Sequence, residues 1–136
     1  MLRILTPKEI NDTYPTIYKS IFGISPTNQI PRTVIVQEKD DKIVGFISGY
    51  LIDKETFYMA WGGSVSKFVN SKKSWNEMEG FFKEHGVKWF QTNVQNTNTQ
   101  CQRILMGIGW IPFGIKATGG KLYIEYFKEL LTWHHM

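Results

Sequence analysis

The chain has 136 residues, of which 42% are hydrophobic and 15% aromatic, and it carries a formal net charge of +4 at pH 7. This length and composition predict a single domain over residues 1–136 with a proper core, and they argue against a disordered chain. The modest positive charge weakly favours anionic partners, such as nucleic acid or a phosphate-bearing cofactor.

Targeting and redox signals in the sequence are few. No apolar run approaches the ~18 residues that a membrane span needs, so we expect no membrane partner. The first residues show no secretory signal pattern. Cys101 is the only cysteine, so the chain forms no intrachain disulfide. These features predict a cytoplasmic location.

The first predicted elements are a short strand and a helix. Thr6 is the expected N-cap, Pro7 the first helical residue, and Glu9 the partner that closes a capping box. Apolar residues between Ile10 and Ile21 then recur at helical spacing. Pro15 lies inside this pattern and predicts a kink or a break there.

The middle of the chain predicts strands followed by a helix. Residues 32–52 read as a hairpin that turns at Asp40 and Asp41, and residues 56–63 read as a third strand. The next helix begins between Asn70 and Ser74, carries its apolar side chains on one stripe and has Gly86 as its C-cap.

The last third of the chain predicts a strand at 87–94, a helix at 97–108, and strands at 110–117 and 121–127. Gly119 and Gly120 separate the last two strands. The complete order is β-α-β-β-β-α-β-α-β-β. It predicts a mixed α/β fold in which an antiparallel meander leads into one βαβ unit.

The most informative stretch runs from Val94 to Gly114. An asparagine-rich polar run leads into a short helix, which Asn98 or Thr97 can cap. Gly109 can adopt the left-handed conformation that ends a helix, and Trp110 then turns inward to begin the next strand.

The element order and this stretch resemble the GNAT superfamily of acyl-coenzyme A N-acyltransferases. That family often shows Asn, then a small residue three positions on, Tyr seven on, and Gly-Phe eleven and twelve on. Those places are held here by Asn98, Cys101, Leu105, Gly109 and Trp110. The resemblance implies a mixed, mostly antiparallel sheet of six to seven strands with helices on both faces.

The resemblance also implies acetyl-CoA as the cofactor and an amine, on a small molecule or a protein, as the acceptor. Asn98 and Cys101 would lie beside the coenzyme arm, and the thioester would lie between the central strands near residues 59–63 and 90–94. The expected phosphate contacts are Asn70, Lys72, Lys73 and Ser74. Tyr58 and Glu55 are the first candidates for proton transfer, and the other available groups are Glu38, Asp53, Glu125 and Tyr123.

The sequence departs from the family pattern at two places. The family's glycine-containing pyrophosphate loop corresponds to residues 69–75, where no glycine is present, so phosphate contacts would depend on lysine charge and the Ser74 hydroxyl. Leu105 occupies the position at which many family members have a tyrosine that serves as general acid for the leaving thiolate. Leucine cannot donate a proton. Cys101 at the small-residue position is either a packing residue or a nucleophile.

Three functions fit these observations. The first is an acyl-CoA-dependent N-acyltransferase. The second is a GNAT-like protein without that chemistry, with a structural or binding role and a phage or host protein partner, since small GNAT-like proteins of tailed phages look similar. A phage-encoded chain would be located in the host cytoplasm or in the virion. The third is nucleic-acid binding or modification through a basic, aromatic patch, whose expected members are Trp61, Lys67, Lys72, Lys73 and Trp75. No histidine has metal-ligand spacing with a second strong partner, so no metal is expected.

Overall fold

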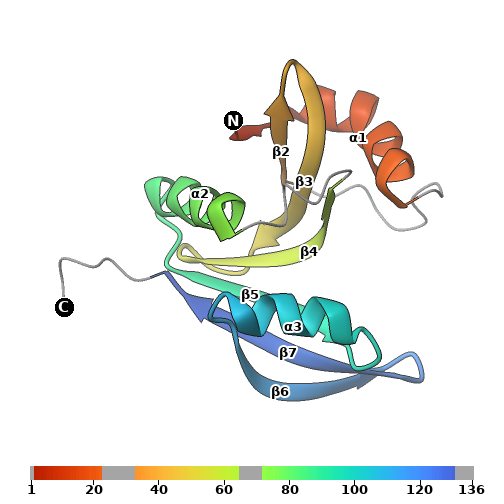
Figure 1. Cartoon of the computed structure of the whole chain (residues 1–136), viewed down its shortest axis with the longest axis vertical. Coiled ribbons are helices and arrows are strands. Elements are labelled where there is room, and N and C mark those ends of the chain that lie inside the picture. The colour runs from red at the N-terminus through yellow and green to blue at the C-terminus, as the bar shows by residue number, and fades with distance from the viewer. Residues whose placement is uncertain (1, 23–32, 65–71, 131–136) are drawn as a thin grey trace. The chain divides into compact units, whose positions relative to one another are not determined.

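The structure is a computed structural model that describes residues 2–22, 33–64 and 72–130, of which 20–22, 61–64 and 72 are described by their backbone alone (Figure 1). Its elements follow the predicted order. They are β1 (Leu2–Ile4), α1 (Pro7–Phe22), β2 (Thr33–Lys39), β3 (Lys42–Leu51), β4 (Thr56–Ser64), α2 (Lys72–Glu84), β5 (Trp89–Gln95), α3 (Thr99–Gly107), β6 (Ile111–Thr118) and β7 (Lys121–Glu129).

The strands form one sheet of seven in the order β1-β2-β3-β4-β5-β7-β6. Antiparallel pairs join β1 to β2, β2 to β3, β5 to β7, and β6 to β7, whereas β4 and β5 are parallel. The predicted mixed α/β class and the mostly antiparallel sheet are therefore confirmed. None of the helices in the described part of the chain is long and apolar enough to cross a membrane.

The chain divides into two compact units. The first comprises residues 1–50 and 59–81, and the second residues 51–58 and 82–136. The single domain expected from the sequence stays a prediction.

In the first unit, α1 packs on one face of β2 and β3. The buried cluster joins Leu5 and the helix residues Ile10, Tyr14, Ile17 and Tyr18 to the strand residues Val34, Val36 and Phe46. The ring of Tyr14 meets that of Phe46 edge-on, with centroids 5.7 Å apart. Apolar residues at helical spacing in α1 and at alternate positions in β2 and β3 thus form one continuous core.

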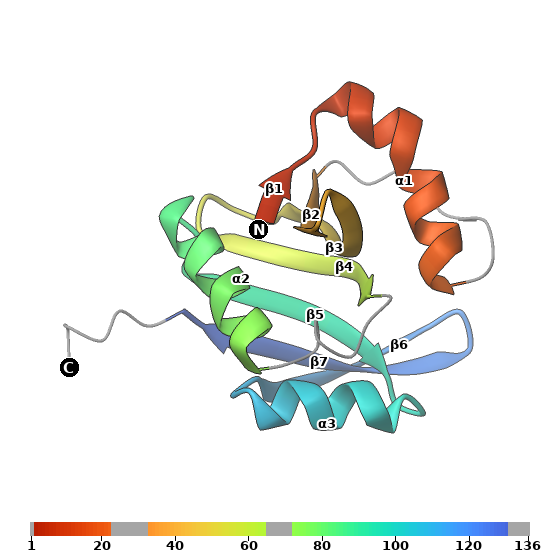
Figure 2. The same ribbon diagram turned by 45° about the horizontal axis from the view of Figure 1, so that its top comes forward.

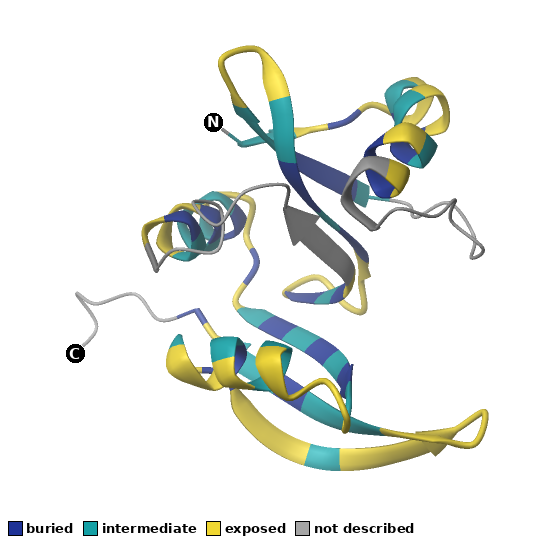
Figure 3. Cartoon of the chain, turned by 45° about the vertical axis from the view of Figure 1, so that its right-hand side comes forward, coloured by how far each residue is buried: buried dark blue, intermediate teal, exposed yellow. Residues whose placement is uncertain are grey.

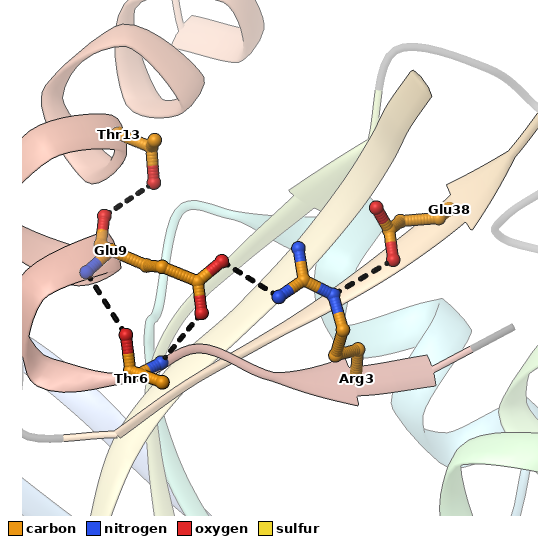
Figure 4. A network of polar contacts seen from close by, with 5 residues as sticks. All are labelled: Arg3, Thr6, Glu9, Thr13 and Glu38. Atoms are coloured by element: carbon orange, nitrogen blue, oxygen red, sulfur yellow. Dashed lines mark hydrogen bonds and ion pairs between the residues drawn. The ribbon is translucent and has the colours of Figure 1, made fainter. Parts of the chain in front are cut away.

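A polar network ties the start of α1 to β1 and β2 (Figure 4). The Thr6 backbone N–H donates to Glu9 Oε1 at 3.1 Å, and the Glu9 N–H donates to Thr6 Oγ1 at 3.2 Å, which confirms the capping box. Arg3 donates to Glu9 Oε2 at 2.7 Å and to Glu38 Oε1 at 3.0 Å. The bond from Arg3 to Glu9 is the largest cause that lowers the pKa of Glu9 below its usual value.

The sequence predicts a kink or a break at Pro15, and the structure excludes the break, because α1 does not end there. The helix continues to Phe22, although its ribbon changes direction part-way along in Figure 2. Proline removes the N–H that would bond to the carbonyl of Asn11, and Asn11 is exposed, so water can satisfy that carbonyl. Tyr14 and Tyr18 are buried on either side of Pro15 and hold both halves of the helix on the sheet.

The turns predicted for both hairpins are confirmed. Asp40 and Asp41 have φ of 53° and 62°, and Gly119 and Gly120 have φ of 59° and 75°. Two consecutive residues with positive φ match the right-handed twist of the strands that they join.

In the second unit, β7 lies between β5 and β6. The register places Phe90 opposite Lys128, Thr92 opposite Tyr126 and Val94 opposite Ile124. Figure 3 shows buried residues alternating with half-buried ones along β5. The buried face carries an aromatic core in which the Phe90 ring stacks on Trp110 at 5.6 Å and meets Phe82 edge-on at 4.9 Å.

Candidate active site

Helix α3 begins directly after β5, and Asn98 is its N-cap. The Asn98 side-chain oxygen accepts a hydrogen bond from the Cys101 backbone N–H at 3.1 Å. Asparagine suits this place because its short amide satisfies one of the N–H groups that a helix leaves free at its start. Asn98 itself is exposed, so the other atoms of its side chain face solvent.

The other end of α3 turns the chain back into the sheet. Gly109 has φ of 94°, and the Trp110 N–H donates to the Leu105 carbonyl at 2.9 Å, as in a Schellman-type ending. Trp110 is 3% exposed, which assigns it to the core and not to an aromatic binding site. The glycine and the tryptophan at the end of α3 therefore have a structural explanation.

The inner side of α3 carries a small polar cluster. The Tyr126 hydroxyl donates to Gln102 Oε1 at 2.8 Å, and Gln102 Nε2 donates to the Asn96 carbonyl at 3.1 Å. Burial raises the pKa values of Tyr126 and of the half-buried Cys101. A thiol with a raised pKa is a poor nucleophile, so the structure favours a packing role for Cys101.

Leu105 is 3% exposed and belongs to the core. No proton donor thus replaces the family's tyrosine at that helix position, and the nearest hydroxyl that the structure shows bonded to α3 is that of Tyr126 on β7. Sequence reasoning missed the pairing of Tyr126 with Gln102. Strand alternation predicts that Tyr126 faces inward, but only the packing of α3 on β7 shows its partner.

Strands β4, β5 and β7 carry many polar side chains on the face of the sheet opposite α3. Tyr58 pairs with Gln91 in the parallel ladder, Gln91 with Phe127, and Asn93 with Glu125. All five side chains are half-buried. We call this surface the polar sheet face. It brings a predicted catalytic residue, Tyr58, onto the same surface as Glu125.

Glu55 lies in the exposed turn before β4. Its carboxylate contacts Lys88 Nζ at 2.6 Å, and its carbonyl accepts from the backbone N–H groups of Lys88 and Trp89. The same contact raises the pKa of Lys88. Asp53 accepts from the Glu55 N–H at 2.8 Å, and this bond lowers the Asp53 pKa. These contacts explain Glu55 as a residue that fastens the turn to β5.

The predicted phosphate contacts fall in the first unit. Asn70 lies outside the described residues, and Lys72 is described by its backbone alone. Lys73 is exposed in the first turn of α2, whereas Ser74 is buried at 7% exposure. Among these positions, Lys73 is therefore the described side chain that is open to an anion.

The structure resembles solved acetyltransferases over nearly its whole length. Ard1 from Thermoplasma volcanium covers 97% of this chain and 98% of its own length, with a TM-score of 0.72 and 14% identity. The ribosomal-protein-S18-alanine N-acetyltransferase from Escherichia coli covers 97% and 96%, with a TM-score of 0.71 and 9% identity. An aminoglycoside 6'-N-acetyltransferase complexed with coenzyme A covers 97% and 98%, with a TM-score of 0.67 and 11% identity.

By sequence, no family model and no curated protein matches the chain. The structural likeness nevertheless defines the class of fold, and it confirms the fold that the resemblance implies. The chain has the GNAT fold of the N-acetyltransferases. The likeness to phage proteins stays a prediction.

Proposed function

We propose that this chain is an acyl-CoA-dependent N-acyltransferase that uses acetyl-CoA and acts on an amine. The observation that carries the proposal is the position of Asn98, which caps α3 directly after a strand in parallel pairing with β4. The solved structures with this fold include N-acetyltransferases and one complex with coenzyme A, which supports the proposal.

The residues present fit the coenzyme in part. The exposed atoms of Asn98 at the start of α3 are free to contact the amide-rich arm, and the N-terminus of a helix favours the partial negative charge of a carbonyl oxygen. Lys73 is open to a phosphate, and we assign the same role to Lys72. The buried Ser74 fits a phosphate contact less well. When bound, acetyl-CoA would supply an acyl group activated as a thioester.

Acyl transfer to an amine also requires two proton transfers. A protonated amine loses its proton before it can form the C–N bond, and the thiolate released when the C–S bond breaks takes up a proton. We assign the second step to the hydroxyl of Tyr58 on the polar sheet face. The sequence-based proposal for the first step is Glu55, although its ion pair with Lys88 already accounts for that carboxylate.

Calorimetric titration with acetyl-CoA tests the proposal. We expect binding to the wild-type chain, and weaker binding to Asn98→Ser. Serine is nearly as good an N-cap as asparagine, so this variant keeps the helix and removes only the amide. Asn96→Ala is the matched control, because Asn96 is an exposed asparagine of the same loop. Absence of binding to wild type at millimolar acetyl-CoA would reject the function.

The second candidate function is that of a GNAT-like protein without acyl transfer. The buried Leu105 favours this candidate, because it takes the place of the tyrosine that serves as general acid in the family. Such a protein would act through a protein partner, from a phage or its host. Mass spectrometry of the purified chain separates the two functions, since bound coenzyme A would exclude this one. Of the nucleic-acid patch, Lys67 and the side chains of Trp61 and Lys72 lie outside the described part of the chain.

A further inference from the structure

Glu125 lies on the polar sheet face, on strand β7 between β5 and β6. Its register partners are Asn93 on β5 and Gly114 on β6. A Cβ atom added at Gly114 would lie 2.7 Å from Glu125 Oε1, which is closer than a Cβ atom comes to a neighbouring oxygen without one of them shifting. The carboxylate therefore lies over Gly114, in space that any larger residue at that position would occupy.

Gly114 follows an irregularity in the strand. The register between β6 and β7 shifts between Pro112 and Gly114, so that Phe113 is the extra residue. The ring of Phe113 meets that of Phe127 edge-on at 5.7 Å, and Phe127 stacks on Trp89 at 5.7 Å. The bulge thus brings the ring of Phe113 against that of Phe127, which lies two residues from Glu125 on the same face of β7.

Glu125 has no partner of its own in the described residues: it makes neither a hydrogen bond nor an ion pair there. Other carboxylates are engaged, since Glu9 and Glu38 contact Arg3, and Glu55 contacts Lys88. Lys116 pairs with Tyr123, one step along the ladder, but it is exposed and does not contact Glu125. A half-buried carboxylate without a partner has given up part of its hydration and gains most from a cationic ligand.

The neighbouring groups select the kind of cation. Aromatic faces attract an ammonium group within ~6 Å of the ring centroid, and the Asn93 side chain, directly across the ladder from Glu125, can accept one of its N–H groups. Tyr58 belongs to the same face, in the row of Gln91 and Phe127, about two strand spacings or ~10 Å from Phe127.

From this geometry we propose that Glu125, with Asn93 and the aromatic side chains of Phe113 and Phe127, forms a binding site for a primary ammonium group on an apolar or aromatic stem. The inference rests on the proposed function, because it assigns the acceptor amine to this site. The Glu125 carboxylate holds the ammonium, Asn93 orients it, and the rings cover the stem.

Nuclear magnetic resonance of the full, isotope-labelled chain tests the site without coenzyme. The probe is 2-phenylethylammonium, and 2-phenylethanol is its neutral counterpart. We expect saturable shifts at the Asn93 side-chain amide and the Gly114 backbone amide with the ammonium alone. Glu125→Gln should weaken binding at least tenfold, and so should Gly114→Ala, which displaces the carboxylate at its flexible end and leaves the backbone intact.

Glu129→Gln is the matched control. Glu129 is a carboxylate on the same strand and the same face, opposite Trp89 and away from Gly114. The inference fails if 2-phenylethanol binds as well as the ammonium, if Glu125→Gln keeps wild-type affinity, or if Glu129→Gln loses as much. Because no acetyl-CoA is present, these outcomes are independent of the calorimetric test, and either can fail while the other succeeds.

Discussion

Replacement of Trp110 offers the sharpest test of how α3 is fixed to the sheet. Trp110 is 3% exposed and stacks on Phe90, with ring planes 14° apart. Its indole Nε1 is buried and has no hydrogen-bond partner among the described residues. The side chain therefore contributes packing but also carries an unsatisfied polar group.

The two effects can be separated with Trp110→Ala and Trp110→Phe. Truncation to alanine removes the whole ring and should destabilise the fold by about 3–5 kcal/mol. Phenylalanine keeps one stacked ring and loses about 2 kcal/mol of burial, at about 0.8 kcal/mol per methylene-sized group. It also removes the unsatisfied N–H, whose desolvation costs about 1–3 kcal/mol. Trp110→Phe should therefore lie within about 1 kcal/mol of wild type.

Urea unfolding followed by far-ultraviolet circular dichroism measures both free energies without relying on tryptophan emission. Ile115→Ala serves as the control, because Ile115 is 71% exposed on the neighbouring strand and should change stability by less than about 0.5 kcal/mol. If Trp110→Phe were as destabilising as Trp110→Ala, the indole N–H would have to be satisfied in the folded chain, and an unpaired indole would be refuted.

Three further outcomes are expected. Asn98→Ala should lower the free energy of unfolding by about 1 kcal/mol through loss of the N-cap, and Asn98→Ser should restore most of it, both measured by urea unfolding. Cys101 should react with iodoacetamide more slowly at pH 8 than a free cysteine does, because burial raises its pKa, and equal rates would contradict that burial. Arg3 lowers the pKa of Glu9 in the folded state. The contact therefore stabilises the fold above the unfolded-state pKa of 4.5, and this stabilisation is lost as pH falls through the folded-state pKa of Glu9. Arg3→Ala should therefore flatten the loss of stability on acidification below that pH, and an unchanged acid-unfolding profile would exclude the contribution.

Local patterns in the sequence were sufficient for the elements and their ends. The capping box of Thr6 and Glu9, the cap at Asn98 and the turn at Gly109 each depend on hydrogen bonds between residues a few positions apart. Such contacts are determined by the residues that form them, so their pattern can be read from the sequence. The exception is Pro15, where burial of the flanking tyrosines outweighs the local tendency to end the helix.

The candidate site depends on contacts between residues far apart in the chain. The sequence alone predicts that β6 and β7 form a hairpin, but it does not predict that β7 pairs with β5, or that the register shifts before Gly114. A shift of one residue in register moves every side chain of a strand to the opposite face. Whether Glu125 lies over a glycine, beside Asn93 and on the same face as Tyr58 was therefore decided by the tertiary structure, because strand register is set by packing across the whole sheet.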